Sequence, residues 1–326
     1  MLISIVLSFR NEEENIPELI SRLHKSLKTT GCGYEFIFVN DDSTDGSLKL
    51  LMEMRKSDKT IRIINMSRRF GSTPCVLAGM RLAKGDAVVY MDTDLQDPPE
   101  LIPELVSKWK KGADVVYTTR VSRDGESPLK MWLTKKAYRV LKVFSEIDLP
   151  VDSGDFKLLD RRVVKEVLKL KEKDAFMRGL VSWVGFRQEQ VFYAREKRFA
   201  GNTHYPIFGL GPISAFTSGL TSFSLAPLSL SLIIGFLVSV GAFMYLVAII
   251  VMKFLNMNLP GWSAIMVTML FLGGTQLFTV GILGIYIGRI YNENKKRPNY
   301  IIESTSGFED DRDKDQTDDL RLRLYR

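Results

Sequence analysis

The chain has 326 residues, 45% of them hydrophobic and 25% charged, and its formal net charge at pH 7 is +7. This length accommodates one mid-sized domain and a further segment. The basic residues are dispersed among acidic ones, which argues against a nucleic-acid-binding protein with a concentrated basic stripe. The isolated Cys32 and Cys75 have neither metal-ligand nor disulfide spacing.

Short apolar segments alternate with amphipathic ones from the N-terminus to about residue 120. Apolar runs predict strands at 3–7, 34–39, 61–65, 87–91 and 114–118, and helical spacing predicts helices at 15–27, 47–55, 73–83 and 99–110. This alternation predicts an α/β fold with a wound, mostly parallel sheet. In such sheets ligands bind beyond the carboxyl ends of the strands, where the polar clusters of this region lie. Further helices are expected at 129–144 and 161–170.

The C-terminal part contains two long stretches without a charged residue, at 199–252 and 254–288. A helix needs about 20 apolar residues to cross the hydrocarbon core of a bilayer. We therefore predict transmembrane helices at 224–252 and 262–288, joined into a hairpin by a short connector. Glycine and proline interrupt the stretch at 206–223, which we expect to lie along the membrane interface as an amphipathic segment.

The distribution of basic residues predicts the orientation of this hairpin. Four of them follow the second apolar stretch, Arg289, Lys295, Lys296 and Arg297, whereas the connector side carries only Lys253. The positive-inside rule then places both termini in the cytoplasm and the chain in the cell (inner) membrane as a multi-pass protein.

These boundaries leave a cytoplasmic catalytic domain at 1–205 and a cytoplasmic tail at 289–326. From Glu303 the tail mixes acidic and basic residues with few apolar ones. This composition predicts disorder or an assembly segment. Self-association of the hairpin into a homo-oligomer is also expected.

The residues with the clearest chemical meaning are Asp92 and Asp94, which stand one residue apart after the predicted strand at 87–91. Two carboxylates at a strand end can reach one divalent cation across a tight turn. Oxygen ligands suit Mg²⁺ or Mn²⁺, which usually also take phosphate oxygens of a substrate. A solvated pair of aspartates is the alternative interpretation of the motif taken alone.

An ordered series of motifs supports the metal interpretation. The series is Asn11–Ile16, Asp41–Gly46, Arg69–Gly71, Ala78–Gly79, Gly85–Asp86, Asp92–Glu100, Ser153–Phe156 and Arg198–Tyr205. With these motifs the chain resembles the inverting GT-A polyprenyl-phosphate glycosyltransferases, which include the bactoprenol glucosyltransferases and dolichyl-phosphate mannose synthase. The resemblance covers nearly the whole soluble part, and the two predicted spans are most similar to the bacterial members.

The resemblance implies a role for each matching residue on the donor side. Phe9, Asn11, Glu12 and Asp41 would line the nucleoside pocket, with Asp41 accepting a hydrogen bond from the base. An ordinary Asx turn that caps the next helix is the alternative for the loop that begins at Asp41.

The metal and the diphosphate would be held by two further groups. The resemblance assigns the metal to Asp94 and Gln96, with Asp92 close by. It also implies that Arg198 and the turn containing Gly201 and Thr203 fold over the donor diphosphate, to which a basic side chain and a permissive loop are suited. A residue that snorkels at the membrane edge is the alternative for Arg198.

On the acceptor side we expect Arg120 and Lys135 to bind the phosphate, with Arg123 in reserve; a solvated helix face is the alternative for Lys135. Asp155 matches the position of the family's catalytic base. A lipid monophosphate is already mostly a dianion at neutral pH, however, and hardly needs a base. We therefore expect Asp155 to position the acceptor and to complement positive charge at the anomeric carbon, with Asp94 as its catalytic partner.

Together these expectations describe an inverting, metal-dependent hexosyltransferase. It would use a nucleotide-sugar, with UDP-glucose as the first choice, and a polyprenyl (undecaprenyl) phosphate acceptor at the membrane. Lys157, where the family often has Arg, is one of several departures that leave the base and sugar open. GDP-mannose or another UDP-sugar is therefore an alternative donor, and a non-catalytic scaffold or nucleotide-sugar sensor is the alternative from another class.

Overall fold

The computed structural model describes residues 1–123, 153–173, 175–195, 224–255 and 261–308. The chain is divided into two compact units. The first contains most of the N-terminal part together with the segment from Arg297 onward, and the second contains the segment from Leu220 to Lys296. The predicted interfacial segment at 206–223 and the predicted helix at 129–144 lie outside the described residues.

An eight-stranded sheet forms the centre of the first unit, in the order β7-β5-β6-β4-β1-β2-β3-β8. Strand β1 is parallel to β2 and β4, β2 to β3, and β5 to β7, whereas β6 runs antiparallel to β4 and β5, and β8 to β3. The prediction of a wound, mostly parallel α/β sheet is therefore confirmed. The strands are β1 Leu2–Phe9, β2 Gly33–Asn40, β3 Ile61–Met66, β4 Ala87–Asp92, β5 Val115–Arg123, β6 Ser153–Asp160, β7 Gln188–Arg195 and β8 Ile302–Ser306.

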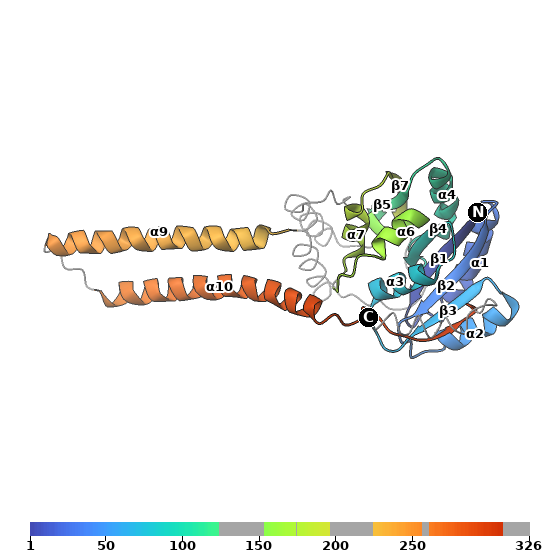
Figure 1. Cartoon of the computed structure of the whole chain (residues 1–326), viewed down its shortest axis with the longest axis horizontal. Coiled ribbons are helices and arrows are strands. Elements are labelled where there is room, and N and C mark those ends of the chain that lie inside the picture. The colour runs from blue at the N-terminus through green and yellow to red at the C-terminus, as the bar shows by residue number, and fades with distance from the viewer. Residues whose placement is uncertain (124–152, 174, 196–223, 256–260, 309–326) are drawn as a thin grey trace. The chain divides into compact units, whose positions relative to one another are not determined.

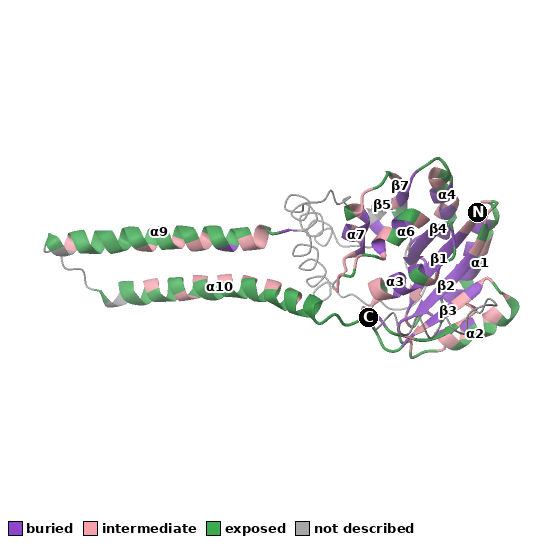
Figure 2. Cartoon of the chain, in the orientation of Figure 1, coloured by how far each residue is buried: buried purple, intermediate pink, exposed green. Residues whose placement is uncertain are grey.

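Helices cover both faces of this sheet, because its central strands are apolar on both sides (Figure 2). One core cluster joins the sheet to α1, α2 and α4, and the other joins it to α3, α6 and α7. Helix α3 approaches closely at Gly79, where an added Cβ would lie 2.4 Å from Val6 Cγ1. The elements are α1 Ile16–Lys28, α2 Ser47–Ser57, α3 Ser72–Leu82, the 3₁₀ turn η1 Pro99–Leu101, α4 Ile102–Lys110, α6 Arg161–Val167 and α7 Met177–Trp183.

Several elements differ from the sequence-based expectations. The strand expected at 114–118 extends to Arg123, and β6 and β7 form where no strand was predicted. The tail prediction is wrong for its first residues, since β8 pairs with β3 from Ile302 to Ser306. A polar strand at a sheet edge needs few apolar residues, because one of its faces and its outer edge remain exposed.

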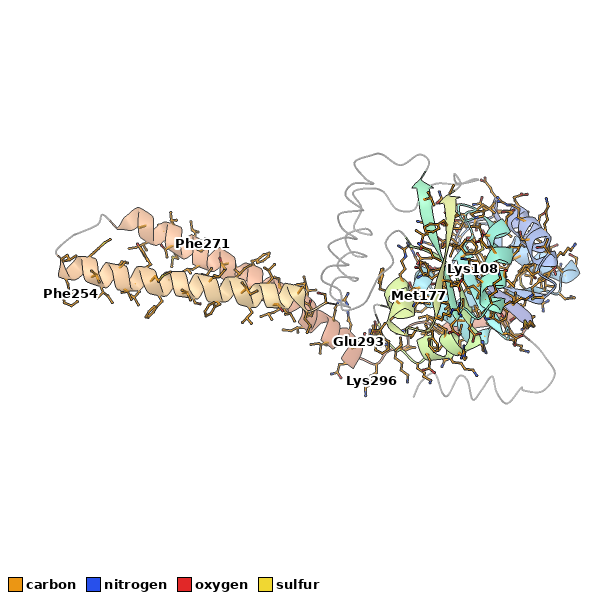
Figure 3. All side chains as sticks on the ribbon, turned by 90° about the horizontal axis from the view of Figure 1, so that it is seen from above. Lys108, Met177, Phe254, Phe271, Glu293 and Lys296 are labelled. Carbon is orange, nitrogen blue, oxygen red and sulfur yellow. The ribbon has the colours of Figure 1, made fainter. Side chains whose placement is uncertain are left out.

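The second unit contains two long apolar helices, α9 Ala226–Phe254 and α10 Trp262–Asn294. Both are long and apolar enough to cross a membrane. Apolar side chains project from all sides of each helix (Figure 3), and near one end the Tyr286 hydroxyl donates a hydrogen bond to the carbonyl of Ser224 at 2.8 Å.

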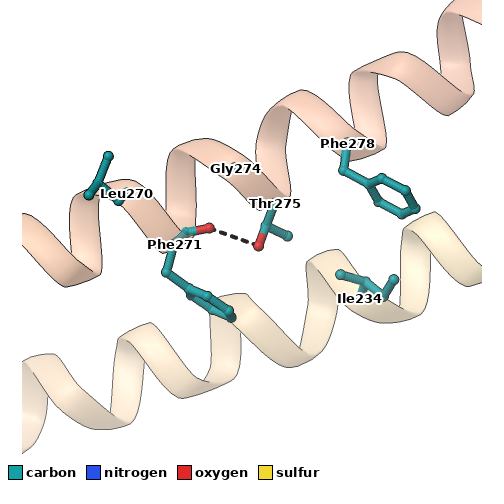
Figure 4. Close-up of a pocket in the computed structure, with 6 residues that line it drawn as sticks. All are labelled: Ile234, Leu270, Phe271, Gly274, Thr275 and Phe278. Carbon is teal, nitrogen blue, oxygen red and sulfur yellow. Dashed lines mark hydrogen bonds between the residues drawn. The ribbon is translucent and has the colours of Figure 1, made fainter.

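The two helices enclose a shallow groove lined by Ile234, Leu270, Phe271, Gly274, Thr275 and Phe278 (Figure 4). Its only side-chain hydroxyl, that of Thr275, donates to the Phe271 carbonyl of its own helix at 2.9 Å. Because no charged side chain lines this groove, it offers nothing to bind a diphosphate. The polar residues that follow the strands lie in the first unit.

Candidate active site

The order of the strands identifies the edge of the sheet at which a ligand would bind. From β1 the chain proceeds to β2 and β3 on one side and then returns to place β4 on the other side of β1. A crevice forms beyond the carboxyl ends of the strands at such a switch point. The described residues there include Asn11 after β1, Asp41 after β2, and Asp92 at the end of β4.

The turn after β4 is strained. Leu95 has a φ of 59°, in the left-handed region that residues with a side chain rarely adopt. Its side chain is 1% exposed and belongs to the core, so packing holds the backbone in this conformation. The turn brings Asp94 and Gln96 together, with the Gln96 N–H donating to Asp94 Oδ1 at 3.2 Å.

Asp155 joins this edge because β6 is antiparallel to β4. Tyr90 pairs with Lys157, and continuing the register places Asp155 opposite Asp92. Arg178 of α7 grips the Asp155 carboxylate with two hydrogen bonds, from Nε to Oδ1 at 2.9 Å and from Nη2 to Oδ2 at 2.5 Å. Such a bidentate pair fixes the plane of the carboxylate.

The pKa values of Asp92 and Asp155 are shifted in opposite directions. Burial and the carboxylates of Asp94, Asp97 and Asp155 raise the pKa of Asp92 to about 7. Burial also acts to raise the pKa of Asp155, but the Arg178 guanidinium outweighs it and brings that pKa to about 2. Asp155 is therefore anionic throughout the physiological range, while Asp92 is held near its titration point.

A divalent cation fits this arrangement. Several carboxylates crowd around Asp92, and a cation would relieve the repulsion that raises its pKa. The described residues hold no group of three His, Cys, Asp or Glu side chains placed for a metal. The predicted set of Asp94, Gln96 and Asp92 contains two carboxylates and would leave the remaining positions to water and substrate phosphate, as Mg²⁺ commonly requires.

The predicted nucleoside-pocket residues lie at the ends of β1 and β2. Asn11 is exposed, with a φ of 55°, and its Oδ1 accepts the Thr44 N–H at 2.8 Å. Glu12 is buried, and its N–H donates to Ser47 Oγ at 2.9 Å. The Phe9 ring, only 2% exposed, packs edge-on against Phe38 in the core. A contribution of Phe9 to the pocket thus depends on its backbone.

Asp41 is buried and bonded to backbone. Its carboxylate accepts from the N–H of Phe70 at 2.6 Å and from that of Gly71 at 3.0 Å. The first N–H of the following helix has a different acceptor in the same loop, since Asp45 Oδ1 accepts the Ser47 N–H at 3.1 Å. Asp41 therefore ties the Phe70–Gly71 loop to β2, and binding of a base by its remaining lone pairs stays a prediction.

Arg120 lies at the carboxyl end of β5, at the same edge of the sheet. Its Nε donates to the Tyr193 hydroxyl at 3.0 Å, and its Nη2 lies 3.6 Å from Asp97 Oδ1. Burial acts to lower the pKa of Arg120, but the nearby Asp97 and Tyr193 outweigh it and raise the pKa. A permanent cation thus lies among the carboxylates of the site.

Other predicted residues cannot be placed. Arg198, Gly201, Thr203 and Lys135 lie outside the described residues, and of Arg123 the structure describes only its backbone in β5. Their roles stay predictions.

Sequence reasoning missed four polar residues that the fold brings to the site. Asp97, Tyr193 and Arg178 make the contacts described above, and the fourth is Lys157. Lys157 is 1% exposed and lies two residues along β6 from Asp155, and burial lowers its pKa to about 8. The motif of aspartates could have indicated Asp97, but Tyr193 and Arg178 come from elements that had not been predicted.

Comparison with known proteins identifies the family of the chain. Residues 4–168, which include the ends of β1, β2, β4 and β5 and the start of β6, match the family model described as Glycosyl transferase family 2. An uncharacterised glycosyltransferase of Bacillus subtilis is 44% identical over 310 residues, with 95% of each chain covered.

The bactoprenol glucosyl transferase of Shigella phage SfV is 37% identical over 305 residues, which cover 93% of this chain and 99% of the relative. Among solved structures, the glucosyl-3-phosphoglycerate synthase of Mycobacterium tuberculosis, in complex with phosphoglyceric acid, aligns with a TM-score of 0.47 at 22% identity. That alignment covers 68% of this chain and 79% of the synthase.

Proposed function

The chain belongs to glycosyl transferase family 2, and we propose that it transfers a hexose from a nucleotide-sugar to a polyprenyl phosphate, with UDP-glucose as the expected donor. The observation that carries this proposal is the likeness to bactoprenol glucosyl transferases, because it extends over 93% of the chain and includes the region of the two apolar helices. A chain with such helices is suited to an acceptor that is itself embedded in a membrane.

We propose a single displacement. An oxygen of the acceptor phosphate attacks the anomeric carbon, the bond from that carbon to the donor diphosphate breaks, and the nucleoside diphosphate leaves with the electron pair. The configuration of the sugar is inverted. A bound Mg²⁺ or Mn²⁺, held by Asp94 and Gln96 with Asp92 nearby, would neutralise charge on the departing diphosphate.

Asp155 acts in this reaction as a fixed negative charge. Arg178 occupies both carboxylate oxygens and keeps the carboxylate ionised. A group with a pKa of about 2 is a poor general base near pH 7. The acceptor phosphate needs little deprotonation, so the role left to Asp155 is electrostatic: it stabilises the positive charge that develops on the sugar.

Binding of the substrates is assigned to the two halves of the site. We assign Asn11, Glu12 and Asp41 to the donor side and Arg120 to the acceptor side. We assign the diphosphate to Arg198 with Gly201 and Thr203, and further acceptor contacts to Lys135 and Arg123. The catalytic domain and both termini would face the cytoplasm.

The test is transfer of labelled sugar from a panel of UDP- and GDP-sugars to undecaprenyl phosphate by the full chain in detergent. We expect one glycolipid, formed with Mg²⁺ or Mn²⁺ and lost with chelator. The Asp94→Asn variant should lose the activity, whereas the matched Asp58→Asn variant, altered at the far end of α2, should keep it. Product from GDP-mannose alone would replace the expected donor, and no product with any donor would refute the proposal.

A further inference from the structure

The hydroxyl of Tyr193 bridges Arg120, which the proposed reaction uses, and Asp97, which it does not use. It donates a hydrogen bond to Asp97 Oδ1 and accepts one from Arg120 Nε at 3.0 Å. Asp97 also faces Arg120 directly, with 3.6 Å between Asp97 Oδ1 and Arg120 Nη2. The three side chains thus form a closed triangle of a cation, a phenol and an anion.

The strands build this triangle. Arg120 and Tyr193 are opposite each other in the register of the parallel pair β5–β7. On the other neighbour of β5, a Cβ added to Gly154 of β6 would lie 3.3 Å from Arg120 Nη2 and 3.5 Å from its Nε. The guanidinium therefore has Tyr193 on one side and the bare backbone of Gly154 on the other, which leaves it little freedom.

Asp97 connects the triangle to the metal loop. It follows Gln96 by one residue, and its side chain is fully buried. Its Oδ1 accepts the hydrogen bond of the Tyr193 hydroxyl, so the loop that carries Asp94 and Gln96 is bonded directly to the residue that contacts Arg120. Arg120 in turn lies beside Gly154, the residue before Asp155.

We propose that Tyr193 and Asp97 are positioning residues that hold Arg120 in the orientation that binds the acceptor phosphate and link it to the metal loop. This inference rests on the proposed function, since it takes Arg120 as a ligand of a prenyl monophosphate. A guanidinium that is already immobilised loses less rotamer freedom when it binds the phosphate. By holding Arg120 in place, Tyr193 and Asp97 therefore favour acceptor binding without touching either substrate.

Tyr193→Phe tests this positioning role, because it removes the hydroxyl that bonds Arg120 and keeps the ring. We expect the KM for polyprenyl phosphate to rise about tenfold, the loss typical of one hydrogen bond to a charged group, while the KM for the nucleotide-sugar stays within about twofold. Tyr34→Phe is the matched control, because the Tyr34 hydroxyl bonds His24 at 2.9 Å in another part of the sheet. It should leave both KM values unchanged.

A double variant separates positioning from a merely structural role. If Tyr193 acts through Arg120, adding Tyr193→Phe to Arg120→Gln should raise the acceptor KM no further, because residues of one network are not additive. Gly154→Ala, which crowds the same guanidinium, should also raise the acceptor KM and spare the donor KM. Additive effects of Tyr193→Phe and Arg120→Gln, or an unchanged acceptor KM in Tyr193→Phe, would overturn the inference.

A binding measurement distinguishes failure of the positioning role from failure of the proposed function. Undecaprenyl phosphate alone should raise the melting temperature of the detergent-purified wild type, and raise it less in Tyr193→Phe. Wild type that forms glycolipid, together with a Tyr193→Phe variant that responds to the acceptor as wild type does, would refute only the positioning role. Wild type that neither binds undecaprenyl phosphate nor forms product would refute both.

Discussion

At the residue scale, the carboxylates at the end of β4 make stability depend on pH. The pKa of Asp92 is raised to about 7 by burial and by three neighbouring carboxylates, whereas an aspartate in an unfolded chain titrates near 3.9. Between these two values the folded state binds more protons than the unfolded state. The free energy of unfolding therefore falls as the pH rises through this window, when the protein is free of metal.

We accordingly predict that chelator-treated protein melts at a lower temperature at pH 8 than at pH 5.5, and that Mg²⁺ or Mn²⁺ restores most of the difference. Asp92→Asn removes the titrating group without changing its size, so this variant should lose most of the pH dependence. Thermal unfolding of both proteins at the two pH values measures the effect. A wild type more stable at pH 8 than at pH 5.5, without metal, would contradict the electrostatics described for Asp92.

For Asp155 we predict, in contrast, an effect that does not depend on pH. Its pKa lies near 2 because of Arg178, despite burial, so its charge does not change between pH 6 and 9. We expect Asp155→Asn to lower kcat about 100-fold or more at every pH in this range, as loss of a fixed charge in a site does. The pH–rate profiles of both proteins should have the same shape.

The matched control for this experiment is Arg187→Gln. Arg187 is an exposed arginine that pairs with Glu189 at 3.1 Å, away from Asp155, and its loss should leave kcat unchanged. If the Asp155→Asn variant instead recovered activity at high pH, where the acceptor phosphate is fully ionised, Asp155 would be assigned a proton transfer.

At the element scale, the sequence predicts those strands and helices whose formation depends on the local pattern of apolar residues. The alternation of apolar strands and amphipathic helices from Ile3 to about Thr118 predicts the parallel part of the sheet, and the pair Asp92 and Asp94 marks its functional edge. The antiparallel strands were not predictable in this way. β6 passes through polar residues such as Asp155 and Lys157, which it can place in the sheet because Arg178 of α7 and their own opposite charges compensate them.

Contacts between distant residues account for the rest. Arg178 and Asp155 are 23 positions apart, and Tyr193 and Asp97 are 96 apart. The periodicity of apolar residues along the sequence does not predict such pairs, because they depend on the order of strands in the sheet. The resemblance to a family supplied the roles of single residues but not the side chains that hold them in place.

Strand β8 lends itself to a test of a whole element. It covers the edge of β3, and the Asn65 amide donates to Ser304 Oγ at 2.9 Å. Truncation after Ile301 removes this strand, and we expect the melting temperature of the catalytic domain to fall by about 5 °C or more. The exposed edge should also promote aggregation, measurable by light scattering.

Truncation after Phe308 is the control, because it keeps β8 and the contact of Arg62 with the Phe308 ring, whose centroid is 5.5 Å from the guanidinium carbon. We expect it to melt like the full chain. Equal melting temperatures for the two truncations would mean that β8 adds nothing to the stability of the sheet.

At the scale of the whole molecule, two units of different character share one chain. The first buries its apolar residues between a sheet and its helices, whereas α9 and α10 expose most of theirs. Large exposed apolar surfaces on a helix pair are stable in lipid but not in water. This contrast is typical of a catalytic domain joined to a membrane anchor and agrees with the proposed acceptor in the bilayer.

The pairing of β8 with β3 also constrains the topology of this anchor. The chain leaves the catalytic domain before α9 and returns to its sheet after α10. We therefore propose that the two helices cross the membrane as a hairpin, with both ends on one side. From the excess of basic residues after α10 we propose that this side is the cytoplasmic one. We predict that, in a Cys32→Ser background, an impermeant maleimide labels Asn258→Cys in intact cells and Glu303→Cys only after permeabilisation. Cys75 is buried and should remain unlabelled. Labelling of Glu303→Cys alone in intact cells would invert the orientation but keep the hairpin, whereas labelling of both introduced cysteines in intact cells would place the two ends of α10 on one side and refute the hairpin.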